Sequence, residues 1–531
     1  YTIDIGDSPR NVYLVLTNPT SGGIPTPVIE NRSVSAAARS AEQPTMTEGE
    51  RAVAASLIRT EPFALRDNPG IAGWSAPEPS RHSPRGAAPP PSYAAVPGPE
   101  NYTNRDPADG QYSEYDAVTN RETHDFYYDS TSNPIPAVLA TRVADVPTDY
   151  GPKTLEIWVE YDETDGWASG LTTTMTTALA DAFLSDGGTD NDIYDWVSAV
   201  FGEEWGPEAA AYTNLIDDTD TITILVYPIP YQGVTGPGGV VGFFWGNKDN
   251  YLRGDPSDDR SPSSNERVMF YIDSETLAGT SSPATWEITD RYPNLIVSTL
   301  GHELQYMIDF HQQWVLRSVN TETWLNEMKS LVAEDLIEQK REQRGPRGIA
   351  PPDPYDEQAW GEAGGPAISD GQIPLYNVRT DISLTNWNST GEVLESYAIA
   401  YAFGAYLGRN FGGAQLFSRL GRSTSSVPSS AIAAAVEAAG GPAGMTLEQL
   451  LWRWGAAVLL SGDPSQPTPF RLNAGAWMDS SAGGVDYRLG SINHYYYDYF
   501  ATPSSLDPPY VHAGEIEPPE MAPASKMLYR V

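Results

Sequence analysis

The stretch from Leu295 to Trp314, LIVSTLGHELQYMIDFHQQW, constrains this chain more than any other. Its apolar residues recur with the period of an amphipathic helix. His302 and Glu303 begin the pattern H-E-x-x-H, in which two imidazoles four residues apart lie on one helix face and bind one zinc ion. Position 306 carries Tyr instead of the second His. What the sequence implies about function therefore depends on Tyr306.

The chemistry of this motif needs a complete ligand set. A catalytic zinc takes three protein ligands and a water, and the Glu of the motif acts as general base on that water. In one large class the third ligand is a Glu from a following helix, and WLNEMKSLVAED supplies Glu327, with Glu334 and Asp335 two turns on. A neutral phenol with a pKa of about 10 is a poor zinc ligand. Tyr306 therefore argues against a normal zinc site.

Other histidines offer weak replacements for the missing ligand. His311 lies nine positions after His302, a rotation of about 180° on a straight helix, so it should face away and is expected to be a packing or surface residue. His494, in a tyrosine cluster, is a more distant alternative. The helix could also be a plain core helix without any metal, with an apolar face formed by Leu300, Leu304, Met307 and Ile308.

Strand patterns dominate the first half of the chain and helical patterns the second, which predicts an α+β fold. Strands are predicted at Asn11–Asn18, Thr154–Glu163, Thr221–Ile229, Val240–Tyr251 and Glu266–Asp273. Helices are predicted at Thr172–Leu184, Asp190–Trp205, Leu295–Trp314, Trp324–Arg341, Glu392–Asn410, Ala431–Ala439 and Leu447–Leu460.

Composition divides the chain into four expected parts. Residues 1–30 hold an N-terminal strand, and residues 31–110 are rich in Ala, Ser, Pro and charge, which predicts an extended arm or linker. If this arm is ordered, its own globular domain or a neighbouring copy must hold it, so a pro-segment and an exchanged arm both fit. Residues 111–463 form the globular domain. Residues 464–531 lose helical periodicity and are expected to be a small β appendage or arm.

Charge and cysteine content exclude several functional classes. With 70 acidic and 32 basic residues the net charge is −38, a field that repels nucleic acids and anionic membranes. The acidity indicates a solvated surface, with bound cations or a saline or hot habitat as alternatives. Cysteine is absent, which excludes disulfides and thiolate chemistry. No run of about 18 apolar residues predicts a membrane span.

Two further expectations concern calcium and export. The acidic segment Asp186–Asp195, DGGTDNDIYD, could bind calcium through clustered oxygens, although it lacks EF-hand spacing. The alternative is a polar helix start with Asp near the N-terminus. The chain starts at Tyr1 without Met or a signal peptide, which suggests a processed, exported protein, although a trimmed chain would look similar.

Several spaced motifs together resemble a known family, the hyicolysin-type zinc metallopeptidases, which are secreted members of the thermolysin-like gluzincin class. The helix of that family typically reads H-E-[FL]-Q-H-M-I-x-F, and HELQYMIDF matches at every position but one. WLNE followed by AED fits the next helix. The stretches IYDWVSAVFG, TITILVY, SNERVMFYID and ESYAIAYAFGAYLGRNFG also fit. The resemblance covers residues 120–460 and leaves the two terminal segments unexplained.

The resemblance implies roles for particular positions. It makes His302 and Glu327 zinc ligands and Glu303 the general base, with Tyr306 at the lost ligand position. It implies a thermolysin-like metallopeptidase domain, and it makes strand Glu266–Asp273 the edge on which a peptide substrate lies by strand addition.

Two main hypotheses follow. In the first, the chain is a catalytically impaired or inactive peptidase fold that serves as an extracellular structural, self-assembling or binding protein. Its partner is then a peptide or protein segment, including the arms of neighbouring copies, and open head-to-tail contacts of that kind generate filaments. In the second, it is an active secreted zinc endopeptidase that uses His302, Glu327 and an atypical ligand. A carbohydrate- or surface-binding module is a third class, which only exposed-looking aromatic residues favour.

Overall fold

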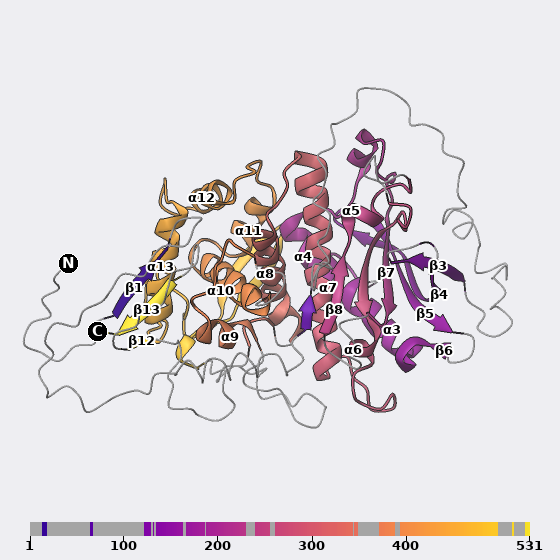
Figure 1. Ribbon diagram of the computed structural model, residues 1–531, viewed down its shortest axis with the longest axis horizontal. Coiled ribbons are helices and arrows are strands. Elements are labelled where there is room, and N and C mark those ends of the chain that lie inside the picture. Colours follow the sequence, from indigo (N-terminus) through magenta and orange to yellow (C-terminus); the bar gives the residue numbers. More distant parts are fainter. Residues whose placement is uncertain are drawn as a thin grey trace, which may run out of the picture. The chain divides into compact units, whose positions relative to one another are not determined.

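The chain divides into two units. The computed structural model describes residues 13–18, 64–66, 122–128, 131, 134–162, 166–185, 187–229, 239–254, 261–342, 345–348, 371–387, 393–496, 512–513 and 526–530. Unit 1 comprises Tyr1–Phe63, Thr321–Ala359 and Gly364–Val531, and unit 2 comprises Ala64–Asn320 and Trp360–Ala363. Figure 1 shows the elements coloured along the sequence.

Unit 2 is built on one mixed sheet with the strand order β2-β8-β9-β7-β5-β4-β3, and β6 pairs with β5. Strands β5, β7 and β9 run parallel to one another, whereas β3–β4, β4–β5 and β8–β9 are antiparallel. The strands are β2 (Ala64–Arg66), β3 (Thr123–Tyr127), β4 (Pro134–Thr148), β5 (Gly151–Asp162), β6 (Gly166–Trp167), β7 (Thr221–Tyr227), β8 (Gly239–Phe244) and β9 (Val268–Asp273).

The sequences of the central strands explain their place in this sheet. Strands β7, TITILVY, and β9, VMFYID, are apolar runs, and they are buried along nearly their whole length. Parallel strands covered on both faces have this composition, because neither side meets water. The strands predicted at 221–229 and 266–273 are therefore present, and both lie in the core of the sheet.

Helices cover this sheet. They are α3 (Thr173–Phe183), α4 (Ile193–Phe201), α5 (Gly246–Asp249), α6 (Ser274–Ala278) and α7 (Arg291–Asp309), with short 3-10 turns at Ala168–Gly170 and Pro207–Ala211. Helix α7 packs against β8, β9 and α4 (Figure 1). It continues without a break into a π-helical segment, Phe310–Val315. The predicted helix at 295–314 is confirmed, although the sequence pattern did not indicate the wider π turn at its end.

Unit 1 is mainly helical. Its helices are α8 (Thr323–Arg341), α9 (Gln372–Val378), α10 (Val393–Asn410), α11 (Ala414–Gly421), α12 (Pro428–Ala438) and α13 (Leu447–Leu460), and a 3-10 turn spans His494–Tyr496. Helices α8 and α10 pack closely, since a Cβ on Gly404 would lie 2.8 Å from atoms of Met328 and Val332. Gly404 therefore lets the two helix backbones approach.

Two small sheets complete unit 1. Strands β10 (Met478–Ala482) and β11 (Val485–Leu489) form an antiparallel pair. Strand β1 (Tyr13–Thr17) pairs with β13 (Lys526–Arg530), which also pairs with β12 (His512–Ala513), and this sheet lies against α13. The N-terminal strand predicted at 11–18 is thus paired with a strand from the other end of the sequence.

The predicted α+β class is confirmed, with a strand-rich half followed by a helical half and a separate two-stranded sheet near the C-terminus. The proposed four-part division stays a prediction, and of the arm at 31–110 only residues 64–66 lie within the described residues. No helix in the described ranges has the length and apolarity required to cross a membrane.

Candidate functional site

Helix α7 places the three motif residues of unit 2. His302 and Glu303 are completely buried, and Tyr306 is 7% exposed. The rings of His302 and Tyr306 lie on the same face of the helix, with centroids 5.2 Å apart and planes tilted by 52°. Position 306 thus faces the same way as His302, as the four-residue spacing predicts.

The donors of α7 do not match a normal zinc site. The helix offers one imidazole and one phenol, where a zinc site of this type takes two imidazoles from its helix. Across the described residues, no group of three or more His, Asp or Glu side chains is arranged to hold a metal ion. Helix α7 by itself therefore supplies one imidazole where the motif has two.

Glu327, the expected third ligand, lies on α8 in unit 1. It is completely buried, and the hydroxyl of Tyr397 on α10 donates to its Oε1 at 3.4 Å. The ring of Trp387 meets Tyr397 edge-on, with a centroid distance of 5.0 Å, and so helps to orient the phenol. Sequence reasoning did not single out Tyr397, which is one of several tyrosines in ESYAIAYAFGAY.

Asp335, in the second acidic motif of α8 (AED), has a structural role. Asp335 is bound by two nitrogens of the Arg409 guanidinium, with Nη1–Oδ2 and Nη2–Oδ1 distances of 2.7 and 3.2 Å. Both side chains are almost completely buried, and Arg409 also donates to the Gly490 carbonyl. Asp335 therefore fastens α8 to α10 through a two-pronged ion pair.

The two histidines considered as replacement ligands, His311 and His494, occupy packed positions. His311 lies in the π-helical segment, where its Nδ1 is 3.0 Å from the carbonyl oxygen of Glu203 and its ring is 5.8 Å from that of Trp205. Burial lowers its pKa. In unit 1, His494 Nδ1 lies 2.6 Å from Asn377 Oδ1. The expectation that His311 is a packing residue agrees with these contacts.

The acidic segment at 186–195 begins a helix. Asp192 is the N-cap of α4 and accepts from the backbone nitrogens of Asp195, at 3.0 Å, and Ser185, at 2.7 Å. Both oxygens of this carboxylate thus bind backbone amides, as in a capped helix start. This geometry favours the helix-start alternative over calcium binding, which stays a prediction.

One expectation about the sheet is wrong. Strand β9 was expected to be the edge strand, but it lies between β7 and β8 and pairs with both. The apolar sequence of β9 fits either an edge strand that binds a substrate or an interior strand, so the sequence could not distinguish the two positions. Beyond β8, the sheet ends in β2.

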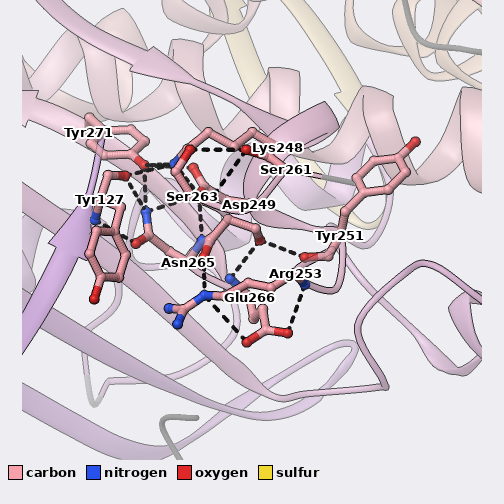
Figure 2. Close-up of polar contacts among 11 residues, drawn as sticks. Tyr127, Lys248, Asp249, Tyr251, Arg253, Ser261, Ser263, Asn265, Glu266 and Tyr271 are labelled. Atoms are coloured by element: carbon pink, nitrogen blue, oxygen red, sulfur yellow. Dashed lines mark hydrogen bonds and ion pairs between the residues drawn. The ribbon is translucent and has the colours of Figure 1, made fainter. Parts of the chain in front are cut away.

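A buried polar network, missed by sequence reasoning, links the short helix α5, which follows β8, to β9 and β3 (Figure 2). Lys248 Nζ donates to Asp249 Oδ1 at 2.6 Å and to the Tyr127 carbonyl at 2.8 Å. Asp249 also accepts from the Tyr271 hydroxyl at 2.6 Å and the Asn265 backbone at 2.9 Å. In the sequence, only the polar start of SNERVMFYID hinted at this network. The Asn265 side chain in that stretch makes two hydrogen bonds with the backbone of Tyr127.

Comparisons with known proteins bear on this site. Residues 134–344 match the peptidase M30 family, a range that includes α7 and α8. Over 224 residues the chain is 27% identical to the neutral metalloprotease ShpI of Staphylococcus hyicus, and the match covers 41% of this chain and 40% of that protein. The chain thus spans less than half the length of that relative. Together these matches confirm the resemblance to hyicolysin-type metallopeptidases and show a peptidase M30-like domain.

Proposed function

We propose that this metallopeptidase-like domain has an incomplete zinc site, is catalytically impaired or inactive, and works as an exported binding or structural protein. The observation that supports this is the ring of Tyr306, which stands beside His302 where a second imidazole is needed. A phenol is neutral at pH 7 and is a weak zinc ligand in that form. Substitution of a residue that only supports a metal ligand typically weakens metal binding roughly 10–100-fold. Loss of a ligand itself should weaken zinc binding by more than that.

An active zinc endopeptidase is the second candidate. The chain keeps Glu303 at the position of the general base and Glu327 at that of the third ligand, both within the peptidase M30 match. Zinc is the metal that this resemblance implies. On this alternative His302 and Glu327 hold it with an atypical further ligand.

Metal content and proteolysis separate the two candidates. The full chain is equilibrated with zinc, separated from unbound metal and analysed for zinc by mass spectrometry, and its cleavage of casein is compared with that of Glu303→Gln. We expect far less than one zinc per chain and no cleavage that depends on Glu303. Stoichiometric zinc together with cleavage abolished by Glu303→Gln would instead establish the active peptidase.

Export and assembly are the remaining parts of the proposal. The resemblance to a secreted family supports export, and the acidic surface charge of the chain is compatible with it. Assembly into oligomers or filaments through the arm at 31–110 stays a prediction.

A further inference from the structure

The side-chain nitrogens of Lys248 and Asn265 face the same three oxygen atoms (Figure 2). These oxygens are Oδ1 of Asp249, the carbonyl oxygen of Tyr127 and the hydroxyl oxygen of Tyr271. Lys248 Nζ lies 2.6, 2.8 and 3.2 Å from them, in that order. Asn265 Nδ2 lies 2.9 Å from each of the three. Because the two nitrogens share all three acceptors, the amine and the amide are held side by side.

This cluster is closed to water. Asp249, Asn265 and Tyr271 are completely buried, and Lys248 is 2% exposed. Lys248 Nζ also lies 5.0 Å from the centroid of the Trp245 ring. A buried ion pair loses the hydration of both charges, whereas transfer of one proton from Nζ to the carboxylate leaves two neutral groups. That transfer turns Lys248 into a neutral amine, which is the nucleophilic form of lysine.

The backbone of Tyr127 orients the amide that faces this amine. Asn265 Oδ1 accepts from the Tyr127 N–H at 2.8 Å, and Nδ2 donates to the Tyr127 carbonyl at 2.9 Å. The N–H therefore points at the oxygen on which negative charge would develop if a nucleophile added to Cγ of Asn265. The Tyr271 hydroxyl donates to Oδ2 of Asp249 at 2.6 Å and so fixes the carboxylate. A nucleophile, a polarised carbonyl group and a proton carrier thus meet at one place.

We propose that Lys248 and Asn265 join in an intramolecular isopeptide bond, and that Asp249 carries the protons. Asp249 first takes a proton from Lys248, and the neutral Nζ then attacks Cγ of Asn265 to form the Nζ–Cγ bond. Asp249 passes its proton to Nδ2 and takes a second proton from Nζ. The Cγ–Nδ2 bond breaks, ammonia leaves, and a secondary amide remains. No oxidant, metal or other reactant is consumed, and the fold has already brought the reacting groups together.

The bond ties helix α5 to the segment that precedes β9. Disulfides are not open to this chain, because it has no cysteine. An isopeptide bond closes the loop between residues 248 and 265 and restricts the unfolded chain as a disulfide does. It needs no zinc, so it goes beyond the proposed function and is the same for an active and an inactive peptidase domain.

Mass spectrometry of the unmodified full chain tests the bond. We expect an intact mass below that of the sequence by one ammonia molecule. Digestion of the denatured chain with trypsin and chymotrypsin should release a branched fragment that joins the segment around Lys248 to Ser261–Arg267. Trypsin should not cleave after Lys248, because an acylated lysine carries no charge. A chain with the full mass of its sequence, or loss of ammonia without this branched fragment, would overturn the proposal.

Two variants assign the roles within the cluster. Asp249→Asn keeps the size of the side chain but cannot carry protons, so it should have the full mass of its sequence and give no branched fragment. Lys248→Met is the control without the amine and should give the same result. The branched fragment in Asp249→Asn would refute the role of Asp249, and loss of ammonia in Lys248→Met would refute that of Lys248. The result on the unmodified chain decides whether the bond exists even if neither variant folds.

Discussion

Tyr306 lies one helical turn after His302 on the same face of α7, and their ring centroids are 5.2 Å apart. The phenol therefore occupies the side of the helix from which a second imidazole would reach a shared metal. Only one side chain separates this helix from the complete motif. The rest of α7 is a well-packed helix, so replacement of that side chain tests the ligand set directly.

Tyr306→His should create a zinc site. The new imidazole would lie four residues after His302 and complete the H-E-x-x-H pattern. We expect zinc affinity, measured by competition with a chromophoric chelator, to rise by more than about 100-fold. Tyr306→Phe is the control, because it removes the hydroxyl and supplies no ligand, and it should leave zinc affinity at the starting level. If Tyr306→His binds no more zinc than Tyr306→Phe, the loss of zinc cannot be ascribed to position 306 alone.

Arg409→Met should strongly destabilise unit 1. It would leave the carboxylate of Asp335 buried without its cation, and the breaking of a buried pair in this way costs about 3–5 kcal/mol. The free energy of unfolding, measured with urea, should fall by about that amount.

The double variant Arg409→Met with Asp335→Leu provides the control for this prediction. It removes both charges together, so most of the stability should return, because an apolar pair of similar volume is often no worse than the ion pair. A double variant as unstable as Arg409→Met would show that the loss comes from packing rather than from the unpaired carboxylate.

Asp192→Asn should change how stability depends on pH. Burial raises the pKa of Asp192 to about 7, and the negative charge of Asp195 adds to this. The native state therefore holds this proton more tightly than the unfolded chain does. The stability that the protonated Asp192 contributes is fully present below about pH 4, which is the pKa of an aspartate in the unfolded chain. This contribution is lost as the pH rises towards 7.

Asparagine caps helices about as well as aspartate and does not ionise. The unmodified chain should therefore lose this part of its stability between pH 4 and pH 7, whereas the Asp192→Asn variant should not. The unfolding free energy of the variant minus that of the unmodified chain then increases over this range. The altered hydrogen bond to the backbone of Ser185 adds a difference that does not depend on pH. Urea unfolding at pH 4.5 and pH 7.5 measures this difference. A difference that does not vary with pH would mean that Asp192 titrates as it does in the unfolded chain.

Local patterns predicted the elements with good boundaries where apolar periodicity was strong. The helix expected at 447–460 is α13, Leu447–Leu460, and the strand expected at 221–229 is β7, Thr221–Tyr227. These segments bury a continuous face or both faces, so the periodicity of their side chains follows their packing. Helix α9, Gln372–Val378, was missed, because seven residues are too few for a clear period.

Pairing between distant segments could not be predicted in the same way. The interior position of β9 and the parallel addition of β2 depend on hydrogen bonds between backbones far apart in sequence. Backbone hydrogen bonding leaves no local pattern in side chains. At the site, the motif placed His302 and Tyr306 on one face, but the partner of Asp335 lies 74 residues away and no pattern marked it.

The pairing of β1 with β13 has a consequence for the order in which the chain can fold. The strands of unit 2 lie between residues 64 and 273, so the eight-stranded sheet is complete in sequence well before the chain ends. The sheet of unit 1 needs residues 13–17 and 526–530 together. During synthesis, β1 can therefore pair with β13 only after residues 526–530 have been made, long after β1 itself. In sequence, unit 2 is inserted between the two strands that form this pair, so β1 and β13 join segments that lie on either side of the eight-stranded sheet.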